Sequence, residues 1–144
     1  MHMFYTLLYT KYDGKSYFKD IGVITPHAGA FLGKISDPFS VSRLWFRDFC
    51  KGAYDWHTVP QKQWIVYLCG KVCIETSGGE IRYFGPGHIL YATDTDGKGH
   101  RSTIIEEGRS LIVTADIETQ DESLPHGTGA GSLGVGSNVR GDIV

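Results

Sequence analysis

The segments Trp56-His57-Thr58-Val59-Pro60-Gln61-Lys62-Gln63 and Gly97-Lys98-Gly99-His100 decide how this chain is interpreted. Each places side chains able to bind a metal at the mouth of a predicted β-strand, and a hairpin with a Gly-rich turn lies between them. Residues this far apart in sequence converge on one interior point when a sheet rolls up. The two segments therefore predict an interior site in a small barrel, and they leave its reaction open.

Short apolar runs that end in turn residues dominate the chain and predict strands. Residues 5–9 and 17–23 flank Asp13-Gly14-Lys15-Ser16 and predict an opening hairpin. The segment from Ser40 to Lys51 is compatible with either a helix or a strand. We expect an antiparallel all-β barrel or jelly roll without a helix longer than about three turns. Its further strands are expected at residues 63–68, 72–76, 81–84, 89–93, 100–105 and 110–117, with a turn at 70–71.

Composition places the chain among ordinary globular proteins. The 144 residues predict one barrel domain, residues 1–118, and a flexible Gly-rich tail, residues 119–144, with little apolar surface. A net charge of −2 without a basic block argues against nucleic acid and anionic membranes as partners. No apolar run approaches the roughly 20 residues of a membrane helix, and no secretory signal is expected. Cys50, Cys69 and Cys73 lack CxxC spacing, which predicts reduced thiols in a cytoplasmic protein.

The two segments resemble the two motifs of the cupin superfamily, in particular those of small single-domain cupins. The first motif is Gly, five residues, His-x-His, three or four residues, Glu, six residues and Gly. In this chain Gln63 stands at the Glu position, and His57 and Asp55 match the two histidine positions if Pro60 accompanies a one-residue bulge. The second motif ends in Gly, two residues and His, which Gly97-Lys98-Gly99-His100 matches.

The resemblance spans residues 50–115 and implies a double-stranded β-helix, the cupin jelly-roll barrel, with extra N-terminal strands as in small dimeric cupins. It also implies a single divalent metal ion, of iron, manganese, zinc, nickel or copper, held by His57, Gln63 and His100. Gln63 supplies no negative charge where the family has a carboxylate. A site that has lost its metal and still binds a ligand is therefore the alternative.

Three further residues are candidates for contact with a small-molecule ligand. Asp55 would complete the coordination sphere of the ion. Tyr67 shares the inward face of its strand with Gln63 and either fills the barrel or contacts the ligand. Asp94 either makes a local turn bond, grips the substrate or orients His100.

Two functions stay open for such a site. The first is a metal-dependent enzyme, an oxidoreductase, isomerase or lyase, that oxygenates, isomerises or decarboxylates a small organic metabolite. The second is a metal-free protein that binds a small ligand without catalysis. The aromatic N-terminus, Trp45 and Trp64 predict an apolar outer surface, and we expect a homodimer formed through the N-terminal strands.

Overall fold

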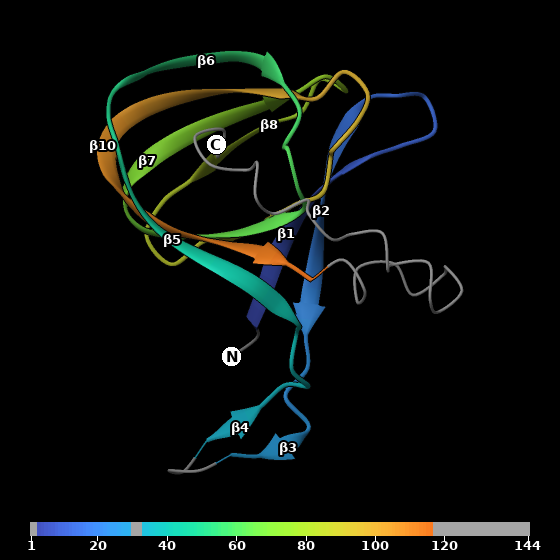
Figure 1. Cartoon of the computed structure of the whole chain (residues 1–144), viewed down its shortest axis with the longest axis vertical. Coiled ribbons are helices and arrows are strands. Elements are labelled where there is room, and N and C mark those ends of the chain that lie inside the picture. The colour runs from blue at the N-terminus through green and yellow to red at the C-terminus, as the bar shows by residue number, and fades with distance from the viewer. Residues whose placement is uncertain (1–2, 30–32, 117–144) are drawn as a thin grey trace.

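The structure, a computed structural model, describes residues 3–29 and 33–116, and this part of the chain contains strands but no helix (Figure 1). The all-β expectation is confirmed. The predicted tail, residues 119–144, lies outside the described residues. The strands are β1 (Met3–Thr10), β2 (Ser16–Val23), β3 (His27–Ala28), β4 (Lys34–Ile35), β5 (Val41–Phe49), β6 (Gly52–His57), β7 (Gln63–Thr76), β8 (Ile81–Phe84), β9 (Ile89–Ala92) and β10 (His100–Ala115).

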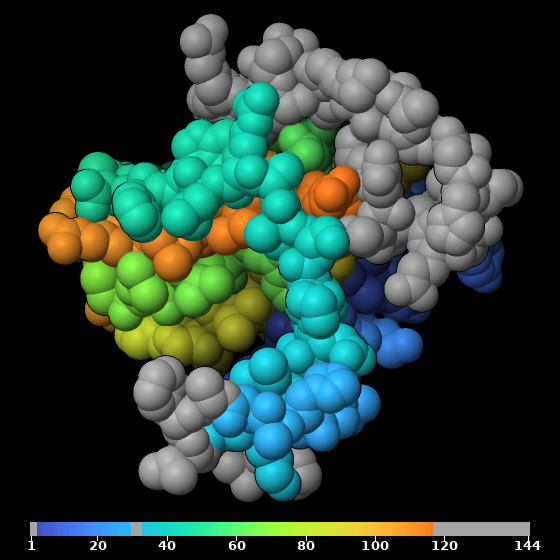
Figure 2. Space-filling model, turned by 60° about the horizontal axis from the view of Figure 1, so that its bottom comes forward, coloured from blue at the N-terminus to red at the C-terminus, as the bar shows by residue number. Residues whose placement is uncertain are grey.

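Two long strands, β7 and β10, organise the barrel. They pair with each other along almost their whole length, and each belongs to two layers. The first half of β7 and the second half of β10 continue into a larger layer in the order β2-β1-β9-β7-β10-β5. The other halves form a smaller layer with β8 and β6. In Figure 2 the teal segment that holds β5 and β6 lies over the orange β10.

The bend of both strands depends on two glycines that touch. Gly70 has a φ of +88°, and a Cβ added there would lie 2.7 Å from the Cα of Gly108. A Cβ added at Gly108 would lie 2.0 Å from the carbonyl oxygen of Cys69. Only residues without a side chain allow the two backbones to approach this closely. The expected turn at residues 70–71 is therefore wrong, because β7 bends there and continues.

The expectation of separate strands at 100–105 and 110–117 is corrected in the same way, since both belong to β10. The segment from Ser40 to Lys51 contains a strand, β5, and no helix. The opening hairpin is confirmed as the antiparallel pair β1–β2. The antiparallel expectation needs one correction, because β1 runs parallel to β9, with Thr6 opposite Leu90.

The apolar core lies between the two layers. The side chains of Leu8, Ile65, Ile74 and Leu90 are almost fully buried in it. The alternation expected along β7 is confirmed for Gln63, Ile65 and Tyr67, which are all buried, and is wrong for Cys69, which is exposed next to the bend at Gly70. Removing such a set of apolar side chains from water is the main stabilising contribution to a domain of this size.

Trp45 and Trp64 are both half-buried, and of the two Trp64 lies on the face of its strand that points away from the core. Trp64 stacks on Tyr91, with ring centroids 4.1 Å apart, and also contacts Tyr5 and Phe39. Trp45 packs against the core. Apolar side chains are also exposed on the outer face of β5 and at the start of β1, among them Phe46, Leu44, Met3 and Phe4.

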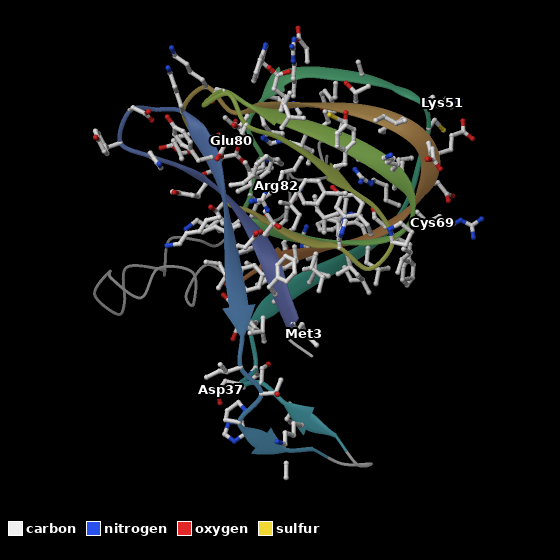
Figure 3. All side chains as sticks on the ribbon, turned by 180° about the vertical axis from the view of Figure 1, so that it is seen from behind. Met3, Asp37, Lys51, Cys69, Glu80 and Arg82 are labelled. Carbon is white, nitrogen blue, oxygen red and sulfur yellow. The ribbon has the colours of Figure 1, made fainter. Side chains whose placement is uncertain are left out.

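Strands β3 and β4 form a small separate hairpin that projects from one end of the barrel (Figures 1 and 2). Met3 and Asp37, labelled in Figure 3, lie toward this end. Cys50, Cys69 and Cys73 are free thiols. Within residues 3–29 and 33–116 no helix is long and apolar enough to cross a membrane.

Candidate functional site

His57 and His100 meet because the last residue of β6 lies opposite the first residue of β10. Their imidazole rings have centroids 4.4 Å apart and planes inclined by 59°. Gly99 makes this approach possible. Its φ is +71°, and a Cβ there would lie 2.0 Å from the carbonyl oxygen of His57. The glycine before His100, which the sequence motif contains, thus fixes the distance between the two histidines.

Asp94 holds the His100 ring. Its Oδ2 lies 2.7 Å from His100 Nδ1, and the Ser16 hydroxyl donates to the same oxygen over 2.8 Å. All three side chains are almost completely buried. A carboxylate oxygen accepts hydrogen bonds, so Nδ1 of His100 donates to Asp94 Oδ2, and Nε2 is the ring nitrogen left for another contact. Of the roles considered for Asp94, the structure shows the hydrogen bond that orients His100.

His57 is held in the same tautomer by a different acceptor. Its Nδ1 donates to the main-chain oxygen of Asp55 over 2.6 Å. Burial lowers the pKa of His57, with a smaller contribution in the same direction from His100, so the ring is neutral near pH 7. Its Nε2 is buried and has no hydrogen-bond partner in the described part of the chain. The Tyr54 ring stacks on the imidazole at 4.2 Å.

Gln63 is fully buried at the start of β7, where it lies opposite Ala92 on β9 and Thr114 on β10. Neither its amide oxygen nor its amide nitrogen has a hydrogen-bond partner among the described residues. His100 pairs with Thr76, at the other end of β7. The structure therefore brings His57 and His100 together, but it shows no hydrogen bond from Gln63 to either ring.

The described residues contain no group of three His, Cys, Asp or Glu side chains arranged to hold a metal ion. The side chain of Asp55 is exposed, and its Oδ1 accepts a hydrogen bond from the main-chain N–H of Trp56. Asp55 thus contributes to the site through its carbonyl oxygen, which holds His57.

A cavity of about 270 Å³ lies beside the pair His57 and His100, where Tyr54, which stacks on His57, forms part of its wall. The cavity is on the side of the barrel where β5 leads into β6 and β7 bends. Figure 3 shows Lys51 and Cys69 on that side of the barrel. Tyr67 lines the cavity and is fully buried, and this burial raises the pKa of its hydroxyl to about 12. The hydroxyl therefore stays protonated at neutral pH. Other residues in the wall are Arg47, Phe49, Tyr54, Ser102 and Ile104.

Sequence reasoning missed Ser16, Arg47 and Tyr54 in this region. Trp45, Arg47 and Phe49 are two residues apart along β5 and therefore share one face of the strand. A strand interpretation of residues 40–51 would have placed all three on the inward face. Ser16 carries no such signal, because its partner Asp94 lies 78 residues away in the sequence.

No family model matches the chain, and no curated protein matches it. Among solved structures, the chain is similar to a putative ethanolamine utilization protein Q from Salmonella typhimurium. That match has a TM-score of 0.37 and 13% sequence identity, and it covers 80% of this chain and 97% of the other. A likeness at this level carries no argument about function, so the functional proposals for this chain depend on the geometry of its site.

Proposed function

We propose that the chain is a cupin-type enzyme for a small organic metabolite, with a single divalent metal ion bound at His57, His100 and Gln63. The observation that carries the proposal is the state of the two imidazoles. Each uses Nδ1 to donate to an oxygen, Asp94 Oδ2 or the Asp55 carbonyl, which leaves Nε2 as the free ligand atom. Histidines that bind metals in proteins are commonly held this way.

The unpartnered buried atoms fit the same proposal. His57 Nε2 and the Gln63 amide oxygen are acceptors without a donor, and a cation would satisfy both. A bound ion would supply Lewis-acid polarisation of a substrate oxygen. The chain's own residues would orient the ligand atoms, since Asp94, which accepts from Ser16, fixes the His100 ring. Oxygenation, isomerisation and decarboxylation all suit such a site.

A second candidate function, metal-free binding of a small ligand, is favoured by one specific observation. None of the three side chains His57, His100 and Gln63 supplies a negative charge, and the described residues provide no third His, Cys, Asp or Glu for an ion. Neutral donors hold a divalent cation weakly. In this case the same atoms, His57 Nε2 and the Gln63 amide, would form hydrogen bonds to a polar group of the ligand.

Metal analysis separates the two functions. Protein purified without chelators is loaded in turn with iron, manganese, zinc, nickel or copper, desalted, and measured by elemental mass spectrometry. The enzyme proposal predicts about one ion per chain, loss of that ion in His100→Ala, and tighter binding in Gln63→Glu, which adds a negative charge beside the cation. His88→Ala is the control, because His88 is exposed. Wild-type protein without metal after every loading contradicts the enzyme proposal.

We also propose that the chain forms a homodimer. Strand β5 pairs only with β10 among the described strands, so it lies at an edge of the sheet. Leu44 and Phe46 on this strand are exposed, with Phe46 at 80%. An edge strand with exposed apolar side chains suits pairing with a second copy around a two-fold axis. The start of β1, with Met3 and Phe4 exposed, is the N-terminal surface that the sequence suggested.

A further inference from the structure

Arg47 places a positive charge in the wall of the cavity, and its described contacts are all uncharged. Its Nε donates to the Ser110 hydroxyl over 3.0 Å, and its guanidinium also hydrogen-bonds the neutral Tyr67 hydroxyl. The guanidinium carbon lies 5.1 Å from the centroid of the Phe49 ring. Other arginines of the described chain pair with carboxylates, namely Arg82 with Asp20, Arg101 with Glu75 and Arg109 with Asp48.

A half-buried cation that forms no ion pair with a described carboxylate is unusual, because removing a charge from water is unfavourable unless an opposite charge compensates. Desolvation lowers the pKa of Arg47, and only Tyr67 acts against this effect. The guanidinium is still charged at neutral pH. The position therefore favours an anion that is not part of the described chain.

The rest of the cavity wall indicates what kind of anion this is. The rings of Phe49, Tyr54 and Tyr67 and the side chain of Ile104 give the cavity a largely aromatic and apolar lining. Ser102 adds one more polar group, a buried hydroxyl with no hydrogen-bond partner in residues 3–29 and 33–116. A strongly hydrated inorganic anion gains nothing from such walls, whereas an organic anion with an apolar body does. At about 270 Å³ the cavity is slightly smaller than the roughly 300–1,000 Å³ of pockets for drug-sized ligands, which favours a smaller molecule of about one ring.

We propose that this cavity binds a small aromatic or cyclic monocarboxylate, with its carboxylate on the guanidinium of Arg47 and its ring against Phe49 and Tyr54. The planar guanidinium offers two parallel N–H donors to the two carboxylate oxygens. The Ser102 hydroxyl then donates to a polar substituent of the ring. Because Tyr54 stacks on His57, the ring of the ligand lies next to the histidine pair. The inference deepens the proposed small-molecule site and does not depend on the metal ion.

Benzoate is the probe for the first test, and benzamide is its neutral counterpart of the same shape. Binding is followed by chemical-shift changes in two-dimensional NMR spectra of the full chain. We expect saturable binding of benzoate at millimolar concentration, with shifts centred on the Phe49 and Tyr54 amides. Benzamide should bind about tenfold more weakly or worse, because it lacks the charge that pairs with Arg47.

Variants connect the binding to Arg47. Arg47→Gln should weaken benzoate binding by about tenfold or more. Arg47→Lys keeps the charge and loses the paired donors, so its affinity for benzoate should lie between those of the wild type and Arg47→Gln. Arg109→Gln is the matched control, because Arg109 is an exposed arginine of the neighbouring strand β10. It should bind benzoate like the wild type. If Arg47→Gln does not fold, Arg47→Lys and the comparison of benzoate with benzamide still decide the question.

Any one of the following results would overturn the inference: no benzoate binding by the wild type at millimolar concentration, equal binding of benzoate and benzamide, or equal binding by Arg47→Gln and Arg109→Gln. Inorganic phosphate that displaces benzoate completely at similar concentration would also refute it, since the site would then recognise charge alone. The metal content of the same wild-type sample distinguishes the two proposals. Benzoate binding by protein that takes up no metal supports the carboxylate-binding cavity and contradicts the metal-dependent enzyme. Metal uptake without benzoate binding supports the enzyme and contradicts the carboxylate-binding cavity.

Discussion

Replacing Gly99 by alanine tests whether the contact between this glycine and β6 assembles the histidine pair. Gly99 and Gly79 both have positive φ, +71° and +94°, so an alanine at either position costs about 1–2 kcal/mol of backbone strain. At Gly79 an added Cβ meets nothing within 4 Å. At Gly99 it would lie 2.0 Å from the carbonyl oxygen and 2.6 Å from the carbonyl carbon of His57.

Ordinary van der Waals contact begins near 3.4 Å, so the carbonyl oxygen would have to move by 3.4 − 2.0 = 1.4 Å. Because both clashing atoms belong to the backbone, the end of β6 must shift away from β10. Overpacking of this kind costs about 1–3 kcal/mol, which brings the expected loss in Gly99→Ala to about 2–5 kcal/mol against about 1–2 for Gly79→Ala.

Equilibrium unfolding in urea measures both losses, with circular dichroism as the signal. NMR spectra of the histidine rings then report whether His57 and His100 still influence each other. Gly99→Ala should change the His57 ring signals strongly, and Gly79→Ala should leave them as they are in the wild type. Equal destabilisation by the two substitutions would refute the reasoning, because the contact with His57 would then contribute nothing.

Three further predictions concern the site and the surface. Because burial lowers the pKa of His57, the unfolded chain binds a proton on this imidazole more tightly than the folded chain does. The free energy of unfolding should therefore decrease as the pH falls below about 6.5, and the contribution of His57 should be complete above that pH. Urea midpoints that change equally with pH in the wild type and in His57→Gln would contradict this expectation. Asp94→Asn should shift the tautomer of His100, seen by nitrogen NMR, and weaken metal binding by about 10–100-fold, whereas unchanged affinity would show that the hydrogen bond does not support an ion. Phe46→Ser should convert a dimer to a monomer in sedimentation experiments, whereas Tyr12→Ser, at a fully exposed turn, should not; a Phe46→Ser variant that remains dimeric excludes this surface.

The parts of the fold that depend on local chemistry could be predicted from the sequence. The turn at residues 13–16 specifies the opening hairpin, and alternation along residues 63–67 specifies which side chains face inward. The continuity of β7 could not be predicted, because a glycine between two apolar runs, such as Gly70, usually indicates a turn between two strands. Whether a strand ends at Gly70 or bends there depends on its contact with Gly108, a residue that is distant in the sequence and becomes a neighbour only in the folded chain.

The candidate site was predictable to a similar extent. His57 and His100 were singled out by spacing, and the structure brings their rings together. The contribution of Ser16 requires knowledge of how the first hairpin packs on the loop before β10, which no local pattern contains. Arg47 was missed because residues 40–51 fit two periodicities, and only the pairing of β5 with β10 selects the strand.

The long ladder between β7 and β10 also bears on how the chain reaches this structure. Its pairs span sequence separations from 100 − 76 = 24 residues, for His100 and Thr76, to 114 − 63 = 51 residues, for Thr114 and Gln63. Closing the longer loop costs about 0.6 kcal/mol more entropy, because its length is roughly doubled. We therefore expect the ladder to form first at the end that carries His100 and to proceed toward Gln63, with amide protection in pulse-labelling experiments appearing in that order. The imidazole of His100 would then be in place before the barrel closes around it.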